Sequence, residues 1–350
     1  MKLIVIGDGK VGRAIVDHAS KEGHEIVVID NNPDAIEQIV EKYDVMGVCG
    51  NGASYDIQKS AGVDKNSLVI AATDSDETNI LSCLIAKKIG AKSTIARVRS
   101  YEYINQINII KKDLGITMTI NPEQESANEI TKIINFPEAL QVDSFAAGKV
   151  DIVELYIPED SDLVGLPLMN LHKKYSTKVL VCAVQRDEEV IIPTGQFIFK
   201  AKDKIHITAK KSEIKSFITK ANLVEDKIKD VMIVGGGKIA VYLGKELLKN
   251  KYSVKIIENN YERCQELSEV LPKASIICGD GSDQNVLLEE GIAQSDAVIC
   301  TTGIDEENII VSLYAYKLGI QKIVTNVRFS GSAESGFCRS AGRGRHLPAQ

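Results

Sequence analysis

The chain repeats itself, and this repeat limits the folds that it can adopt more than any other feature. Residues 2–32 read KLIVIGDGKVGRAIVDHASKEGHEIVVIDNN and residues 230–260 read DVMIVGGGKIAVYLGKELLKNKYSVKIIENN, a displacement of 228 positions. The run CGNG at 49–52 matches CGDG at 278–281 with a displacement of 229, so one residue is inserted between the two stretches. A chain of 350 residues that carries two copies of one unit is predicted to fold into two or three domains.

Each copy alternates segments typical of strands with segments of helical spacing. In the first copy, strands are expected at residues 3–6, 25–29, 45–48, 67–71 and 93–98, and helices at 12–21, 34–43, 54–61 and 77–89. Crossovers between parallel strands return right-handed to the same sheet, so this order predicts a parallel sheet with helices on both faces. The expected fold class is α/β, with tandem Rossmann-like doubly wound parallel sheets.

The segment between the copies has a different pattern. Short β-type runs at 152–157, 179–184, 190–192 and 204–208 are separated by Pro and Gly turns, and one helical stretch lies near 168–175. Residues 126–135 are predicted to form a connecting helix that ends before Phe136-Pro137. The predicted domains are a first Rossmann-like domain at 1–122, the connecting helix at 123–141, a small α+β domain at 142–222, a truncated second Rossmann-like domain at 228–329 and a tail at 330–350.

The last 21 residues have no apolar periodicity and no counterpart in the repeat. Two origins stay open, a non-native tail and a native basic tail. Either origin predicts disorder at residues 330–350.

Composition excludes several classes of function. The net charge of −6 and the pI of about 5.6 argue against a nucleic-acid partner. The seven cysteines never form a Cys-x-x-Cys pair and the five histidines are dispersed, so neither a metal site nor a disulfide framework is predicted. The apolar runs are too short to cross a bilayer and the N-terminus does not resemble a signal peptide. We therefore expect a cytoplasmic protein without direct membrane insertion.

A glycine-rich loop lies between the first strand and the first helix of copy one. It reads GDGKVG at residues 7–12, the G-x-G-x-x-G pattern of dinucleotide-binding folds. Gly7 permits the tight turn, Gly9 lets a pyrophosphate approach the backbone, and Gly12 lets the helix pack closely on the strand. Asp30 follows the second strand, where a carboxylate accepts hydrogen bonds from ribose hydroxyls and would repel a 2′-phosphate. Nucleotide binding is predicted here, with NADP disfavoured.

Copy two keeps most of this pattern. Gly235 and Gly237 repeat the first two glycines, and Glu258 occupies the position of the acid. Ala240 stands where the third glycine would be, an exchange that the pattern tolerates. The sequence therefore predicts a second nucleotide site.

Other polar residues follow the predicted strands. Asn51, Thr73 and Asp74 come just after strands three and four, at the edge where ligands bind in open α/β sheets. Their counterparts in copy two are Asp280, Thr302 and Gly303. Arg97, near the end of strand five, is placed either to reach a phosphate or to form a surface ion pair. The acids at 76–77 are expected to cap the helix that starts there.

No catalytic residues are predicted. Tyr55 and Lys59 have the spacing of a reductase catalytic pair, but they lie too early in the fold, so chance explains the spacing better. The small central domain holds only His172 and His206 as histidines, neither of them near a second acid or base. A Walker-type phosphate loop is missing from the sequence, so ATP hydrolysis is not expected either.

Several motifs together carry a family resemblance. They are the start MKLIVIGDGKVG at 1–12, Asp30, the run TDSDETN at 73–79, IARVR at 95–99, INPE at 120–123 and the 228-residue repeat. With them the chain resembles, over residues 1–329, the TrkA family, the regulatory subunits of Trk-type potassium uptake systems that are built from RCK (KTN) domains. The chain departs from the family pattern in lacking the end of the second unit.

The resemblance implies a homo-oligomeric assembly on the cytoplasmic face of a potassium-translocating membrane subunit. It also implies NAD or NADH, and in related proteins ATP or ADP, as the regulatory ligand. By position, the implied contacts in copy one are Gly7, Asp8, Gly9, Lys10, Val11, Asp30, Asn51, Thr73, Asp74 and Arg97. In copy two they are Gly235, Gly236, Gly237, Lys238, Ile239, Glu258, Asp280, Thr302 and Gly303.

Two other functions stay open at this point. An NAD-dependent oxidoreductase could use the same glycine-rich site, and turnover of small carbonyl substrates would reveal it. A redox-sensing DNA repressor would need a helix-turn-helix and a basic face, and the sequence shows neither. The preferred hypothesis is a regulator in which nucleotide binding shifts the population between two arrangements of paired domains.

Overall fold

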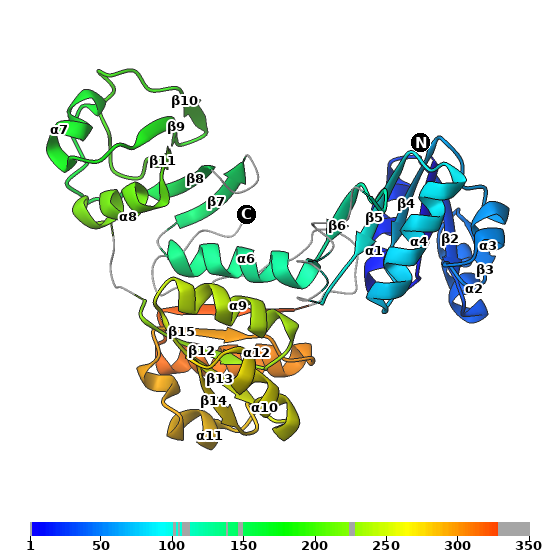
Figure 1. Cartoon of the computed structure of the whole chain (residues 1–350). Helices are drawn as coiled ribbons and strands as arrows, with labels where there is room; N and C mark the ends of the chain where they lie inside the picture. The colour runs from blue at the N-terminus through cyan, green and yellow to red at the C-terminus, as the bar shows by residue number, and fades with distance from the viewer. Residues whose placement is uncertain are drawn as a thin grey trace. The chain divides into compact units, whose positions relative to one another are not determined.

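We describe the fold from a computed structural model, drawn in Figure 1. The residues that it describes are 2–100, 103, 106, 113–137, 139–145, 150–223 and 228–327. The chain divides into two compact units, Met1–Glu125 and Ser126–Gln350. The tail expected at residues 330–350 lies outside the described residues.

The first unit is built on a parallel sheet of six strands. In chain order they are β1 (Lys2–Ile6), β2 (Glu25–Asp30), β3 (Met46–Cys49), β4 (Ser67–Ala71), β5 (Ser93–Arg97) and β6 (Met118–Ile120). Their order across the sheet is β3-β2-β1-β4-β5-β6, and every pairing is parallel. The order reverses between β1 and β4, which is the Rossmann arrangement, and ligands of such open sheets bind at the carboxyl ends of the strands beside the reversal. The edge strand β6 was not among the expected strands.

Among the described residues up to 100, the helices of this unit are α1 (Lys10–Lys21), α2 (Pro33–Lys42), α3 (Tyr55–Ser60) and α4 (Asp76–Ile89). Successive side chains of a strand point to opposite faces, so β1 serves two cores. Leu3 and Val5 pack with Val16 of α1 on one face, whereas Ile4 packs with Cys83 of α4 on the other. The predicted doubly wound sheet with helices on both faces is confirmed.

The connecting helix is α6 (Pro122–Asn135), and the small domain follows it. Its strands are β7 (Ala139–Phe145), β8 (Val150–Tyr156), β9 (Leu180–Arg186), β10 (Glu189–Ile191) and β11 (Lys204–Ala209). Its helices are η1 (Leu168–Asn170), α7 (Leu171–Tyr175) and α8 (Lys211–Lys220). The sheet is antiparallel, in the order β10-β9-β11-β8-β7.

Two elements of the small domain were not anticipated, β7 and α8. Strand β7 begins at Ala139, inside the range 123–141 that was expected to be the connecting helix. The helix ends at Asn135 because a proline follows at position 137, so the next residues are available to a strand.

The second parallel sheet repeats the first. Its strands are β12 (Asp230–Val234), β13 (Ser253–Glu258), β14 (Ser275–Cys278), β15 (Ala297–Cys300) and β16 (Lys322–Thr325), in the order β14-β13-β12-β15-β16. Its helices are α9 (Lys238–Lys249), α10 (Tyr261–Val270), α11 (Gln284–Glu289), η2 (Ile292–Gln294) and α12 (Asp305–Leu318). Each element has a counterpart in copy one in the same place of the sheet, apart from the single turn η2. The tandem fold predicted from the repeat is confirmed.

Candidate functional site

The glycine loop of copy one joins β1 to α1, and two of its positions admit only glycine. Gly7 has φ +101°, and a Cβ there would lie 2.8 Å from the backbone nitrogen of Thr73. A Cβ on Gly12 would lie 1.9 Å from the carbonyl oxygen of Gly7. At Gly9, by contrast, a Cβ would meet no atom of the described residues within 4 Å. The middle of the loop therefore faces open space, where a phosphate can approach the backbone.

Helix α1 begins at this loop with its amide groups available. Gly9 is the N-cap residue, and among the described residues no side chain caps the helix and no acid lies in its first turn. In contrast, Asn32 caps α2 and Ser75 caps α4 through their side chains. Exposed backbone N–H groups and the positive end of the helix dipole favour an anion at this position.

Asp30 is held directly beside the loop. One carboxylate oxygen accepts a hydrogen bond from the backbone N–H of Asp8 at 2.7 Å, and the other accepts one from Asn32 at 2.8 Å. Its own carbonyl oxygen accepts from the N–H of Gly50 at 2.8 Å, which ties the ends of β2 and β3 together. A carboxylate oxygen can accept more than one hydrogen bond, so ribose hydroxyls can still bind here.

An ion pair in the loop was missed by the sequence reasoning. The Asp8 side chain is fully buried, and Arg13 donates to its Oδ2 from Nε at 3.0 Å and from Nη2 at 2.9 Å. This hydrogen bond raises the pKa of Arg13 above its ordinary value. The arginine neutralises a carboxylate that would otherwise repel a phosphate. An acid inside a phosphate loop, followed five residues later by an arginine, was the signal for it.

The end of β4 is shaped by Asn79, which is completely buried on α4. Its Oδ1 accepts from the backbone N–H of Thr73 at 2.8 Å and from the Thr73 hydroxyl at 2.7 Å. Its Nδ2 donates to the carbonyl oxygens of Thr73 at 3.1 Å and Arg97 at 2.9 Å. One buried amide therefore joins the carboxyl ends of β4 and β5.

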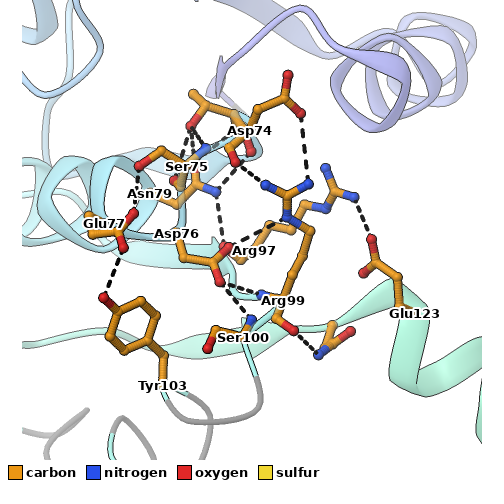
Figure 2. Close-up of polar contacts among 12 residues, drawn as sticks. Asp74, Ser75, Asp76, Glu77, Asn79, Arg97, Arg99, Ser100, Tyr103 and Glu123 are labelled. Atoms are coloured by element: carbon orange, nitrogen blue, oxygen red, sulfur yellow. Dashed lines mark hydrogen bonds and ion pairs between the residues drawn. The ribbon is translucent and has the colours of Figure 1, made fainter. Parts of the chain in front are cut away.

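The expectation that Asp76 caps α4 is wrong, as Figure 2 shows. Ser75 is the cap, and its hydroxyl accepts from the N–H of Thr78. The Asp76 carboxylate instead accepts from the backbone N–H groups of Arg99 at 2.9 Å and Ser100 at 2.7 Å. Asp76 is buried, and the amides that follow β5 are the donors available at that depth.

Glu77, at the next position, does support the start of α4. It accepts a hydrogen bond from the Ser75 hydroxyl at 2.8 Å and another from the Tyr103 hydroxyl at 2.8 Å. Its own backbone N–H and the Ser75 hydroxyl lower the pKa of Glu77. The carboxylate thus stays ionised beside the positive end of the helix.

Arg97 forms an ion pair, but the pair is largely buried and is not the surface pair that was expected as one of its two roles. Its Nη2 lies 3.0 Å from Oε1 of Glu123, at the start of α6. The pair is largely buried, because the two side chains are only 14% and 18% exposed. Asp74 is different: its side chain is 98% exposed, and Arg99 donates to its carbonyl oxygen. The Asp74 carboxylate also lies 3.9 Å from Nη1 of Arg99, an ion pair that is weak because Asp74 is exposed to solvent.

Residues after the third strand form a turn in both copies. Asn51 is exposed and accepts from the N–H of Ala53 at 2.9 Å. Asp280 accepts from the N–H of Ser282 at 2.8 Å and from its hydroxyl at 2.7 Å, and the hydroxyl bond lowers the pKa of Asp280. Each side chain keeps acceptor capacity at the carboxyl edge of its sheet.

Copy two reproduces the backbone of the site. Gly235 also has φ +101°, and a Cβ there would lie 2.8 Å from the nitrogen of Thr302. The N–H of Gly236 donates to Glu258 at 2.7 Å, and that of Asn260 donates to the other oxygen at 2.9 Å. Buried Asn308 accepts from Thr302 at 2.9 Å, as Asn79 does from Thr73 in copy one.

The charges around the second loop differ. Gly236 replaces Asp8, and a Cβ there would lie 2.5 Å from the Leu267 side chain. An arginine is again present, but Arg263 comes from α10 and donates to the carbonyl oxygen of Gly236 at 2.8 Å. Of the other predicted contacts, Lys238 is exposed at the start of α9 and Ile239 is half-buried. Gly303 follows Thr302 and is exposed.

Neither a metal centre nor a membrane span is seen in the part of the chain that the structure describes. There, His, Cys, Asp and Glu side chains do not gather in groups of three or more that could hold a metal ion. Within the same residues, every helix is too short or too polar to cross a membrane.

Comparison with known proteins agrees with the repeat. The TrkA-N domain model matches residues 3–122 and 231–336, and the TrkA-C domain model matches residues 152–221. The Trk system potassium uptake protein TrkA of Vibrio alginolyticus is 35% identical over 332 residues, covering 94% of this chain and 72% of the relative. A TrkA homolog of Archaeoglobus fulgidus is 33% identical over 327 residues, covering 93% and 74%.

Among solved structures, the GsuK channel bound to NAD is similar in fold. The TM-score is 0.64 at 18% sequence identity, with 92% of this chain and 57% of that chain covered. The matched family models, the identity over most of the chain and the tandem Rossmann-like sheets lead to one conclusion. The chain belongs to the TrkA family of potassium uptake proteins.

Proposed function

We propose that this chain is a nucleotide-binding regulatory subunit that acts on a potassium-translocating membrane subunit from the cytoplasmic side. The observation that carries the proposal is the carboxylate of Asp30, fixed 2.7 Å from the N–H of Asp8 in the glycine loop. The uncapped start of α1 beside it supplies the phosphate-binding half of a dinucleotide site. Relatives that are named potassium uptake proteins support the physiological role.

The proposed ligand is NAD or NADH, with ATP or ADP as the alternative. All four carry an adenosine ribose for Asp30 and a phosphate group for the loop. The fold similarity to the GsuK channel bound to NAD supports the first choice. For Arg97 to reach a phosphate, it has to share its guanidinium with Glu123 or release that carboxylate. Asn51, Thr73 and Asp74 complete the proposed contacts at the strand ends.

Regulation follows from differential affinity. A nucleotide that binds one arrangement of the paired domains better than another shifts the population toward it, with a coupling of about 1 to 3 kcal/mol. A homo-oligomer of this chain would carry that shift to the membrane subunit. A bound ligand would cover the exposed start of α1 and the exposed side chain of Asp74, and would thereby change the surface that the chain presents to other subunits.

The test is isothermal titration of the purified chain with NAD, NADH, ATP and ADP, together with an assay for NADH oxidation. We expect sub-millimolar binding at two sites per chain, of which Asp30→Ala removes one. Glu41→Ala is the matched control, because it removes an equally negative but exposed carboxylate from the end of α2. An unchanged number of bound nucleotides in Asp30→Ala would refute the first site, and steady NADH turnover would favour the oxidoreductase instead.

A further inference from the structure

Two cysteines meet beside the acid of the second site. Cys264 lies on α10 and Cys278 is the last residue of β14, where it pairs in register with Glu258 of β13. The Cys264 sulfur lies 3.3 Å from the carbonyl oxygen of Glu258 and 4.0 Å from that of Ile277. Ile277 directly precedes Cys278, so the Cys264 sulfur lies beside the residue that carries the second thiol, and the neighbouring Cys278 contributes to the raised pKa of Cys264. The fold therefore gathers a pair of thiols between the carboxyl ends of two neighbouring strands.

The two thiols differ in their access to solvent. Cys278 is exposed, whereas Cys264 is buried, and burial raises the pKa of Cys264 to about 11. The thiolate is the form that reacts with oxidants, and exposure determines which thiol an oxidant reaches first. Cys278 is thus placed to react with a solute, and Cys264 is placed to react with the product.

Copy one lacks this pair, which makes it an internal control. The displacement of 228 relates Cys264 to Ile36, and that of 229 relates Cys278 to Cys49. Ile36 does face the matching strand, since a Cβ on Gly47 of β3 would lie 2.5 Å from its side chain. The Cys49 thiol donates a hydrogen bond to the carbonyl oxygen of Asn31 at 3.8 Å. The same position in the fold thus holds a single exposed thiol in copy one and a dithiol in copy two.

We propose that Cys264 and Cys278 are a redox-sensitive modification site, at which a hydroperoxide converts the two thiols into an intramolecular disulfide. The Cys278 thiolate attacks the peroxide, an S–O bond forms, the O–O bond breaks, and the leaving alkoxide or hydroxide takes a proton. The Cys264 sulfur then attacks the Cys278 sulfenic acid, so that the S–S bond forms, the S–O bond breaks and water leaves. The two sulfurs lose two electrons, and the peroxide gains them.

The disulfide acts on the backbone that holds Glu258. The two sulfurs have to approach to about 2.05 Å to form the bond, which draws α10 toward β14. The start of α10 is tied to Glu258, because the N–H of Asn260 donates to its carboxylate at 2.9 Å. The hydrogen bond from Cys264 to the Glu258 carbonyl oxygen is lost in the same step. Oxidation therefore changes the geometry of the second nucleotide site and leaves the first unaltered.

The direct test is mass spectrometry of the full chain after brief treatment with hydrogen peroxide. We expect a loss of about 2 Da that dithiothreitol reverses, and a proteolytic fragment in which Cys264 is linked to Cys278. Cys264→Ser and Cys278→Ser should each abolish the link, whereas the matched control Cys49→Ser should keep it. A treated chain without the link, or a reversible loss of about 2 Da that persists in Cys264→Ser, overturns the proposal.

The effect on nucleotide affinity rests on the function proposed above, whereas the disulfide does not. It is measured by titrating ADP and NAD into the reduced and oxidised forms of Asp30→Ala, in which only the second site remains. We expect at least a threefold change in affinity on oxidation. Equal affinities in the presence of the disulfide would overturn the link to the site. Failure of both forms to bind would count against the proposed function and leave the disulfide result standing.

Discussion

The two Rossmann-like copies share the hydrogen bonds that shape the loop and differ in the charges around it. In both, an acid at the end of the second strand lies 2.7 Å from the loop N–H, and a buried asparagine joins two strand ends. Copy one adds the ion pairs of Asp8 and of Arg97, where copy two has Gly236 and Asn326. The backbone of the site is thus repeated, while its charge differs, so the two sites are expected to differ in ligand affinity more than in shape.

The largest difference is expected at the third glycine. A Cβ on Gly12 would lie 1.9 Å from the Gly7 carbonyl oxygen, so Gly12→Val should destabilise the first domain by about 3 kcal/mol and abolish binding there. Copy two already accommodates Ala240, so its loop must stand farther from the helix, and Ala240→Gly should cost about 1 kcal/mol. Peptide-resolved hydrogen exchange of the two Rossmann-like domains measures the loss of stability in each variant. Equal losses of stability in the two variants would show that the two glycine loops do not differ in their distance from the helix.

Next in size is the buried amide. Asn79→Ala leaves the N–H of Thr73 and the carbonyl oxygen of Arg97 without their partner, at a cost of about 2 kcal/mol. Asn308→Ala should cost slightly less, because the hydroxyl of its partner Thr302 donates to Ile304 instead of to the amide. Chemical denaturation of each variant, followed by hydrogen exchange at the strand ends, tests this order. A neutral Asn79→Ala would show that this amide does not hold the two strands.

A smaller difference should appear at the end of the fifth strand. Arg97→Ala leaves the largely buried Glu123 without its cation, for which we expect a loss of about 1 kcal/mol and roughly tenfold weaker nucleotide binding by copy one. Asn326→Ala should change stability by less than about 0.5 kcal/mol, since Asn326 takes part through its backbone carbonyl oxygen. Thermal unfolding and titration of both variants provide the comparison. An unchanged affinity in Arg97→Ala would remove Arg97 from the proposed contacts.

The smallest effect is on thiol reactivity. Burial raises the pKa of Cys83 and of Cys300 to about 12 and that of Cys264 to about 11, so their thiolates appear only as the pH rises toward those values. Iodoacetamide at pH 8 should therefore label the exposed Cys49 and Cys278 first. Labelling of the buried thiols should rise about tenfold per pH unit while the fold persists. Rapid labelling of Cys83 at pH 8 would contradict the burial on which this difference rests.

Much of this fold could be predicted because its signals are local and repeated. Continuous apolar runs gave the buried parallel strands, and the 228-residue repeat gave the tandem arrangement. Strand β6 and strand β7 escaped because they are edge strands, whose exposed residues weaken the apolar pattern. Helix α8 follows directly on a strand, and its charged residues hide the buried face formed by Ile214 and Phe217.

The candidate site could be predicted only in part. The glycines and Asp30 follow a pattern fixed by backbone geometry, so their positions were apparent from the sequence. The role of Asp76 was not, because its donors follow a strand that lies more than twenty residues along the chain. The same holds for the pairing of Arg97 with Glu123, which depends on where α6 begins. Contacts between distant segments do not follow a fixed residue spacing, so a single sequence does not reveal them.

The central claim is that both copies hold a nucleotide through the acid beside the loop. Equilibrium dialysis of the whole chain against NAD and against ADP tests it, with Asp30→Ala, Glu258→Ala and the double variant in parallel. We predict two bound nucleotides per chain in the unaltered protein, one in each single variant and none in the double variant. Full binding by the double variant would contradict the account, because the nucleotide would then be held elsewhere.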